Sequence, residues 1–174
     1  MFSKNITSEK IILRSYNMGD ISSWEKWDLD PEVQVFLPEP KNQPVSIEVY
    51  EKYFKECEDD QEGYYWSIVW RENGTLVGTV SITEINKHHG IGELGIIIGE
   101  KEYWKRGIAQ EAIKMVLEFV RSIDLRRIAA ELEEGNIGIE KTLIKSGFHK
   151  EGVSPLSRVK DGHPINTIKY FILL

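Results

Sequence analysis

The stretch Glu93-Leu-Gly-Ile-Ile-Ile-Gly99, followed by Tyr103-Trp-Lys-Arg-Gly-Ile-Ala-Gln-Glu-Ala112, decides the fold of this 174-residue chain. An apolar run of strand length comes first, and a short charged loop with Lys105 and Arg106 leads from it to Gly107. An amphipathic helix follows directly, with one apolar face formed by Ile113, Val116, Leu117 and Val120. Because the free N–H groups and the dipole of a helix N-terminus favour an anion, this order predicts a site for a phosphorylated ligand.

Two common phosphate motifs do not describe this turn. A P-loop needs Gly-Lys followed by Ser or Thr, and the chain has no such tripeptide. A dinucleotide-binding fingerprint needs three glycines in a βαβ unit of a parallel sheet, whereas Gly107 stands alone. An ordinary basic turn before a helix is the other interpretation of this segment taken by itself.

The composition is that of a globular protein. Hydrophobic residues make up 41% of the chain and charged residues 29%. The length suits one domain with a proper core, so we expect a single domain over residues 1–174. No apolar stretch is long enough to span a bilayer, and the N-terminal Met-Phe-Ser-Lys-Asn lacks the apolar core of a signal peptide. We therefore expect a cytoplasmic protein without a membrane partner.

The net charge of the chain and its cysteine and histidine residues exclude further classes of function. A net charge of −6 argues against a nucleic-acid-binding protein, whose binding surface is basic. It suits a cationic substrate, although solubility alone also explains it. The single cysteine, Cys57, excludes an internal disulfide, and its acidic neighbours indicate a packing residue rather than a reactive thiolate. His88 and His89 are adjacent without a third ligand at a zinc-like spacing, so no metal site is expected.

Apolar spacing and turn residues predict a strand and two helices, then an antiparallel meander of three strands, a helix, a strand, a short helix and two closing strands. The strands are expected at residues 10–16, 64–70, 76–85, 92–99, 127–133 and on both sides of Asp161-Gly162, and the helices at residues 20–27, 46–60, 108–121 and 135–147. Three prolines between Leu37 and Pro44 predict a loop. Because a helix connects the strands 92–99 and 127–133, we expect them to be parallel.

The basic turn resembles the acyl-CoA-binding motif of the GNAT superfamily of N-acetyltransferases. In the subgroup that acts on amino termini and polyamines, the motif commonly reads Tyr-Trp-Gly-Lys-Gly-Tyr-Ala-Thr-Glu-Ala. The matching residues are Tyr103, Trp104, Gly107, Ala109, Glu111 and Ala112. Lys105 departs from the pattern, which has glycine there, and places a long cationic side chain where backbone usually approaches phosphate.

Four other segments resemble the same subgroup, in order and at the right spacing. They are residues 8–14, residues 30–33, Asn136 with residues 145–148, and residues 160–162. The subgroup includes RimJ/RimL-like acetyltransferases of ribosomal-protein amino termini and spermidine acetyltransferases. The resemblance spans nearly the whole chain and implies the GNAT fold, an α+β mixed sheet that is mostly antiparallel and whose central parallel pair splays apart.

The resemblance also implies which residues hold acetyl-CoA as the co-substrate. The pantetheine arm would lie in the splay against the backbone of Ile96, Ile97 and Ile98. An N–H near Ile97 would stabilise the oxyanion. The pyrophosphate would meet main-chain N–H groups from Arg106 through Gly107, Ile108, Ala109 and Gln110. Lys105 and Arg106 would contact the adenosine phosphates, and Asn136 would reach the cofactor arm, cap its own helix, or do both.

Acetyl transfer needs a neutral amine, a stabilised oxyanion and a protonated leaving thiolate. The resemblance places a serine or a tyrosine near the sulfur, but those positions hold Ile139 and Leu143, which have no proton to give. Glu93 and Glu131, on the two central strands, are the candidate catalytic bases, and plain surface carboxylates are the other interpretation. Candidates for binding a cationic amine are Glu84, Asp28, Asp30 and Glu32, and candidates for a pocket wall are Trp24, Trp27 and Trp66.

These features predict an acetyl-CoA-dependent N-acetyltransferase that acts on a primary amine. The acceptor could be a protein α-amino group, as on a ribosomal protein, or a polyamine or another small amine. A CoA-binding module of the same fold without transferase activity is the alternative, motivated by the apolar residues Ile139 and Leu143. The long C-terminal strand could pair across a homodimer.

Overall fold

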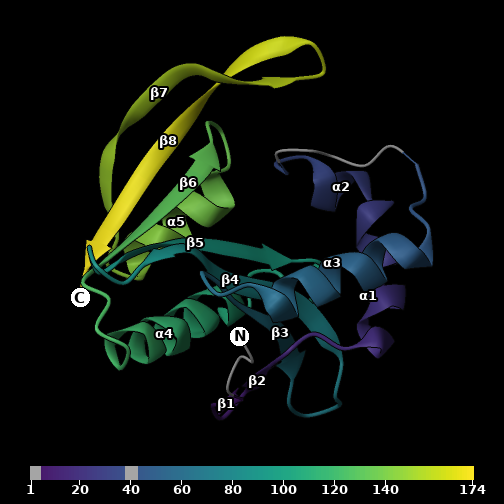
Figure 1. The fold of residues 1–174 in the computed structure, drawn as a ribbon. Helices are drawn as coiled ribbons and strands as arrows, with labels where there is room; N and C mark the ends of the chain where they lie inside the picture. The colour runs from purple at the N-terminus through teal and green to yellow at the C-terminus, as the bar shows by residue number, and fades with distance from the viewer. Residues whose placement is uncertain (1–4, 38–42) are drawn as a thin grey trace.

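The computed structural model describes residues 5–37 and 43–174, and within them one eight-stranded sheet carries helices on both faces (Figure 1). The strands lie in the order β1-β2-β3-β4-β5-β6-β8-β7, and all neighbouring pairs except β5 and β6 are antiparallel. Their bounds are β1 Ile6–Thr7, β2 Ile11–Arg14, β3 Tyr64–Trp70, β4 Leu76–Asn86, β5 Ile91–Ile98, β6 Arg127–Glu133, β7 His149–Lys160 and β8 His163–Leu173. The predicted α+β class, with one parallel pair in a mostly antiparallel sheet, is confirmed.

The described helices are α1 Ile21–Asp28, α2 Pro31–Gln34, α3 Ile47–Asp59, α4 Ile108–Arg121 and α5 Ile137–Lys145, with the 3-10 turns η1 Met18–Asp20 and η2 Lys101–Tyr103. β3, α4 and β6 begin and end at the predicted residues, whereas the sequence pattern does not predict β1, α2, η1 or η2. Residues 38–42 of the predicted proline loop lie outside the described residues. Within the described residues, no helix combines the length and the apolar character needed to cross a membrane.

The two faces of the sheet carry different helices. α4 and α5 cover one face and form the large core with it, while α1 and α3 pack on the other face. Because side chains alternate along a strand, Ile96 of β5 packs against the large core and Ile97 packs with Trp27 of α1. Trp66 is fully buried in the large core, where its ring stacks on Tyr64. The suggestion that Trp66 lines a substrate pocket is therefore wrong.

β5 and β6 pair only near their N-terminal ends. Three residue pairs join them, and the last is Glu93 with Ala129. Beyond this point β5 continues to Ile98 paired only with β4, and β6 continues to Glu133 paired only with β8. Figure 1 shows the two strands diverging, with β6 rising alongside the β7–β8 hairpin. The splay that the family resemblance implies is present, and it leaves two facing strand edges without mutual hydrogen bonds.

The C-terminal strand lies inside the sheet. β8 pairs with β6 on one side and with β7 on the other, so the chain itself uses both of its edges. The outer strand is β7, which carries Pro155 and a register shift between Ser154 and Arg158. Proline and bulges obstruct the addition of another strand. Pairing of the C-terminal strand across a homodimer, as its length suggested, is therefore not available in this fold.

Candidate active site

The edge of β5 that faces the splay is open. In an antiparallel ladder, the main-chain groups of successive residues point to opposite sides of the strand. The N–H of Gly99 donates to the carbonyl of Val77 in β4 at 3.0 Å, which directs Ile97 toward β4 and Ile96 toward the splay. Ile96 N–H and C=O have no partner in β6, because the β5–β6 ladder ends earlier. The open donor that was expected near Ile97 thus lies at Ile96.

Trp104 closes the end of this open edge. Its indole N–H donates to the carbonyl of Ile98 at 2.7 Å, so the loop before α4 is attached to the strand that lines the splay. The preceding residue, Tyr103, is buried and packs on the ring of Trp70 at 5.6 Å between centroids. The Tyr103 hydroxyl accepts from Asn73 Nδ2 at 3.1 Å. These contacts make Tyr103 a support of the loop.

α4 begins at an open turn without a side-chain cap. Gly107 has φ = 80°, a left-handed conformation that glycine adopts readily, and a Cβ at this position would meet no atom within 4 Å. Within the described residues, no hydrogen bond engages the next three N–H groups, those of Ile108, Ala109 and Gln110. Glu111, the acidic residue of the first turn, is hydrogen-bonded to Ser8. The turn therefore presents free amides and the positive helix end to open space, as an anion requires.

Asn136 caps α5 and keeps an unused donor. Its Oδ1 accepts from the N–H of Ile139 at 3.3 Å. Its amide Nδ2 has no hydrogen-bond partner within residues 5–37 and 43–174. The carbonyl of Lys145 in the last turn of α5 accepts from Gln110 Nε2 at 3.4 Å, so α4 and α5 are joined beside the Gly107 turn. Asn136 thus performs the capping role and still offers an amide N–H to a ligand.

The inner face of α5 offers no proton donor. Leu143 is 1% exposed within the large core, and Ile139 is partly buried against it. The hydroxyl of Thr142 donates to the carbonyl of Gly138 at 2.9 Å. The serine and tyrosine that the family resemblance suggests for this helix are therefore replaced by an apolar wall.

Glu93 lies on β5 at the last residue pair before the splay. Partial burial raises the pKa of its carboxyl, and the neighbouring carboxylates of Glu84 and Glu131 raise it further. Arg158 and Lys169 lower that pKa by smaller amounts. No described residue forms an ion pair or a side-chain hydrogen bond with Glu93. A desolvated carboxylate of raised pKa at the apex of a splay suits a general base.

The carboxylate of Glu131 already binds two cations of the chain. Its Oε1 lies 2.7 Å from Nη2 of Arg158, its Oε2 lies 3.7 Å from Nζ of Lys169, and its side chain is 18% exposed. Two cations of the chain thus occupy this carboxylate. Glu131 is therefore a weaker candidate base than Glu93, although the sequence offered either of them.

Sequence reasoning missed the cations that face β6. Arg158 and Lys160 of β7 pair with two glutamates of β6, Glu131 at 2.7 Å and Glu133 at 2.6 Å. In each strand the two partners are two residues apart, so they share a face. The two-residue spacing of these charges is the signal that the sequence offers. It does not reveal that β7 approaches β6, because that approach depends on how the hairpin curves.

The acidic group near α2 has a structural role. Asp28 is buried and accepts from the hydroxyl of Tyr50 at 2.7 Å. Asp30 accepts from the N–H of Glu32 at 3.0 Å and lies 2.8 Å from Nζ of Lys101, whose hydrogen bond lowers the pKa of Asp30. Glu32 also pairs with Lys101. Internal partners thus occupy three of the four carboxylates that were suggested to bind a cationic amine, Asp28, Asp30 and Glu32.

Trp24 and Trp27 form an apolar wall beside Ile97. The Trp27 ring covers Gly99, where an added Cβ would overlap the indole, and its N–H donates to Glu100 Oε1 at 3.0 Å. Trp24 lies 5.2 Å from Tyr16 between ring centroids, and within the described residues its buried indole N–H has no hydrogen-bond partner. Trp27 therefore fixes the position of α1 against the end of β5.

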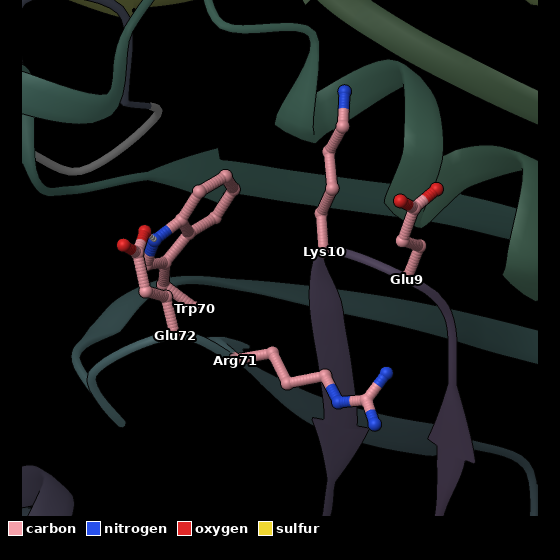
Figure 2. A pocket seen from close by; sticks show the side chains of 5 residues that line it. All are labelled: Glu9, Lys10, Trp70, Arg71 and Glu72. Atoms are coloured by element: carbon pink, nitrogen blue, oxygen red, sulfur yellow. Dashed lines mark hydrogen bonds between the residues drawn. The ribbon is translucent and has the colours of Figure 1, made fainter.

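Other features of the chain do not converge on this site. His88 and His89 lie in the β4–β5 turn, and no three metal-ligating side chains of the described residues gather anywhere. Burial raises the pKa of the Cys57 thiol to about 11, which makes it unreactive. A shallow hollow of about 390 Å³ is lined by Glu9, Lys10, Trp70, Arg71 and Glu72. The cationic ends of Lys10 and Arg71 extend in different directions there (Figure 2).

Curated relatives resemble the chain over most of its length. The uncharacterised protein MJ1062 of Methanocaldococcus jannaschii is 29% identical over 143 residues, 81% of this chain and 28% of that protein. The uncharacterised N-acetyltransferase YoaA of Bacillus subtilis is 31% identical over 115 residues, 66% of this chain and 64% of that protein. The matched region thus spans less than two thirds of either relative.

Solved structures share the fold at low sequence identity. A spermidine N-acetyltransferase from Vibrio cholerae, in complex with CoA and spermine, has a TM-score of 0.84 at 20% identity, over 95% of this chain and 96% of its own. RimL, a ribosomal L7/L12 alpha-N-protein acetyltransferase in complex with coenzyme A, has a TM-score of 0.87 at 16% identity, over 98% of each chain. The sequence profile of the Acetyltransferase (GNAT) domain matches residues 10–149. Since this match covers well over half of the sequence, the chain belongs to the GNAT family of acetyltransferases.

Proposed function

We propose that this protein transfers the acetyl group of acetyl-CoA to a primary amine held where β5 and β6 separate. One observation carries the proposal. The open main-chain edge at Ile96 lies three residues beyond Glu93, a desolvated carboxylate at the last paired position of β5. A donor for an oxyanion and a base for an amine would then lie on one strand, at the opening of one splay.

The residues around the splay fit acetyl-CoA, which supplies an activated thioester when bound. The carbonyl of Ile96 would accept from an amide of the pantetheine arm, and its N–H would stabilise the oxyanion of the transition state. The free N–H groups that follow Gly107 would hold the pyrophosphate. Asn136 would donate its unused amide N–H to the arm while its oxygen caps α5.

Glu93 would serve as the general base. It accepts the proton of the attacking amine, directly or through one water, as the nitrogen bonds to the acetyl carbon and the carbon–sulfur bond breaks. Ile139 and Leu143 cannot return a proton, so the proton that the nitrogen loses reaches the sulfur through solvent. The carboxylate of Glu131, held by Arg158 and Lys169, would help to keep the pKa of Glu93 raised.

The charge pattern favours an acceptor with a single amine, such as a peptide α-amino group. Glu131 and Glu133, the two glutamates of β6, already bind internal cations. A polyamine would bring additional ammonium groups toward Arg158 and Lys160, where Glu131 and Glu133 are already paired. The names of the structural relatives include both an alpha-N-protein and a spermidine acetyltransferase, so both acceptor types belong in the test.

The test is thiol release from acetyl-CoA with a matched set of acceptors. The set contains a short peptide with a free N-terminus, the same peptide with a blocked N-terminus, spermidine and a simple monoamine. We expect release with the free peptide and the monoamine to exceed release with spermidine, none with the blocked peptide, and a mass shift confined to the α-amine. Turnover with spermidine alone would contradict the single-amine acceptor. No turnover with any amine, by protein that binds acetyl-CoA, would contradict the transferase proposal.

A further inference from the structure

Gly95 interrupts the row of side chains on one face of β5. Leu94 and Ile96 pack into the large core on the opposite face. Because side chains alternate along a strand, the position of Gly95 belongs to the same face as Glu93 and Ile97. Those two residues are half-buried, whereas Gly95 between them is exposed. The absent side chain therefore leaves a notch one residue wide, the Gly95 notch.

The hydroxyl of Ser81 borders the Gly95 notch. Ser81 of β4 is the register partner of Gly95, and it lies between the core residues Val80 and Ile82, so its side chain is on the notch side of the sheet. A Cβ added to Gly95 would lie 2.8 Å from Ser81 Oγ. Apart from the two chain neighbours of Gly95, no other atom of the described residues would lie within 4 Å of that Cβ. The notch is thus open space beside one hydroxyl.

The Ser81 hydroxyl differs from two other hydroxyls on this face of the sheet. Ser67 Oγ of β3 donates to the carboxylate of Asp20 at 2.7 Å, and Thr79 of β4 is hydrogen-bonded to the Tyr16 hydroxyl. Both Ser67 and Thr79 are buried. Ser81 is half-buried, and no hydrogen bond within the described residues engages its hydroxyl. Its oxygen can therefore accept a hydrogen bond from a ligand that enters the notch.

The notch adjoins both groups of the proposed active site. The register places Glu93 opposite Thr83, so Glu93 and Ser81 are diagonal neighbours, with Cβ atoms about 7–8 Å apart or less. One nitrogen atom between the two side chains can contact both of them, directly or through one water. The open N–H of Ile96 follows Gly95 directly in the chain. An amine in the notch would thus lie beside the base and beside the oxyanion donor.

We propose that Ser81 binds the acceptor amine in the Gly95 notch. A neutral primary amine has two N–H groups and one lone pair. Ser81 Oγ accepts from one N–H, and Glu93 takes the other proton as the lone pair bonds to the acetyl carbon and the carbon–sulfur bond breaks. The N–H held by Ser81 stays on the amide product, so Ser81 neither gains nor loses a proton.

This inference rests on the transferase function proposed above and adds a residue that selects primary amines. A neutral secondary amine has a single N–H, which cannot serve both Glu93 and Ser81. Its extra substituent would enter the notch and leave the Ser81 hydroxyl without a partner. Such an unpaired polar group disfavours the complex.

The test compares two acceptors of the full chain, a peptide with a primary α-amine and the same peptide with an N-methylated first residue. We expect the parent to prefer the primary amine by at least about tenfold in kcat/KM. Ser81→Ala should lower kcat/KM for the primary amine about three- to tenfold, as the loss of one neutral hydrogen bond does, and the preference should shrink by a similar factor. Ser122→Ala, a control that removes an exposed hydroxyl just after α4, should keep both values within about twofold.

Gly95→Ala tests the notch itself. The added methyl group should lower kcat/KM for the primary amine at least about tenfold while the Kd for CoA stays within about threefold, because the methyl group lies on the sheet face rather than on the splay edge. The double variant Gly95→Ala/Ser81→Ala removes the close contact with Ser81 Oγ. It should regain the parent's midpoint of thermal unfolding without regaining activity. Recovery of activity in the double variant would show that the amine does not occupy the notch.

An unchanged preference for the primary amine in Ser81→Ala, with a parent that acetylates the peptide, would overturn the assignment. Parental kcat/KM in Gly95→Ala would also overturn it. If the folded parent acetylates no amine at all, the transferase function fails instead, so the two failures are distinguishable.

Discussion

Nζ of Lys160 lies 2.6 Å from Oε2 of Glu133, and this contact joins the tip of the β7–β8 hairpin to the end of β6. The same ammonium donates to the carbonyl of Val35 and lies 5.5 Å from the ring centroid of Phe36. Side-chain exposure is 14% for Lys160 and 15% for Glu133, so water screens the pair only partly. One lysine thus holds together the hairpin, the splayed strand β6 and the segment after α2.

Replacing Lys160 by Met should destabilise the fold by about 1–3 kcal/mol, between the values typical of exposed and buried ion pairs. The loss arises because Glu133 is left charged and largely buried without its partner. Urea unfolding of the single variants Lys160→Met and Glu133→Gln and of the double variant measures the coupling between them. Lys141→Met, on α5, is a control for the loss of a surface charge. Additive losses in the double variant would show that the pair is not coupled.

Gly107→Trp should abolish CoA binding and leave the core intact. Because nothing lies within 4 Å of a Cβ at this position, the new side chain would enter the space where the phosphates are proposed to bind. The left-handed φ of 80° adds roughly 1–2 kcal/mol of strain. Gly162→Trp is a matched control, since Gly162 has φ = 76° and similarly open surroundings on the β7–β8 turn. Equal CoA affinity in the two variants, by calorimetry, would place the phosphates elsewhere.

Substitutions at Asn136 should separate helix capping from cofactor binding. Asn136→Ala removes both functions and should cost about 1 kcal/mol of stability as well as CoA affinity. Asn136→Ser keeps an oxygen that can accept from the N–H of Ile139, but it lacks the amide donor. We therefore expect near-parental thermal stability and a weakened CoA Kd for Asn136→Ser. If the serine variant binds CoA as well as the parent, Asn136 is a cap and nothing more.

Glu93→Gln should stabilise the protein at neutral pH. Burial and the neighbouring Glu84 and Glu131 raise the pKa of Glu93 in the folded state above its ordinary value of 4.5. The folded state therefore holds the carboxyl proton of Glu93 more tightly than the unfolded state does. The parent consequently loses stability as pH rises from 4.5 through the raised pKa of Glu93. The uncharged glutamine avoids this loss, and its advantage in urea unfolding should shrink as pH falls toward 4.5. An advantage that is independent of pH would contradict the assigned pKa shift.

The sequence predicted those elements whose signals are local. The apolar face of α4 and the alternation in β3 and β6 set their bounds, and the motif located the left-handed turn at Gly107 from which α4 begins. Asp20 shows where local signals fail, because an aspartate at the start of a helix is commonly its N-cap. The Asp20 carboxylate instead accepts from Arg14 at 2.6 Å and from Ser67 at 2.7 Å. Ser67 is 47 residues away along the chain, so no local window reveals that competition.

The open edge of the site also depends on distant contacts. Whether Ile96 or Ile97 faces the splay depends on the register of β5 against β4, which follows from the pairing of Gly99 with Val77. Apolar run length alone cannot distinguish neighbouring isoleucines. The cations opposite β6 likewise depend on hairpin curvature, since Arg158 reaches Glu131 from a strand that is not its neighbour in the sheet.

The pH dependence of kcat/KM for the free-N-terminus peptide, in the parent and in Glu93→Gln, tests the central claim most directly. If Glu93 is the base, the parent loses activity as pH falls through the raised pKa of Glu93, above 4.5. Glu93→Gln should lose about 10²–10⁴-fold in kcat/KM and should lack this limb, while its Kd for CoA is unchanged. Retention of kcat/KM within about threefold, with the same pH profile as the parent, would contradict the account.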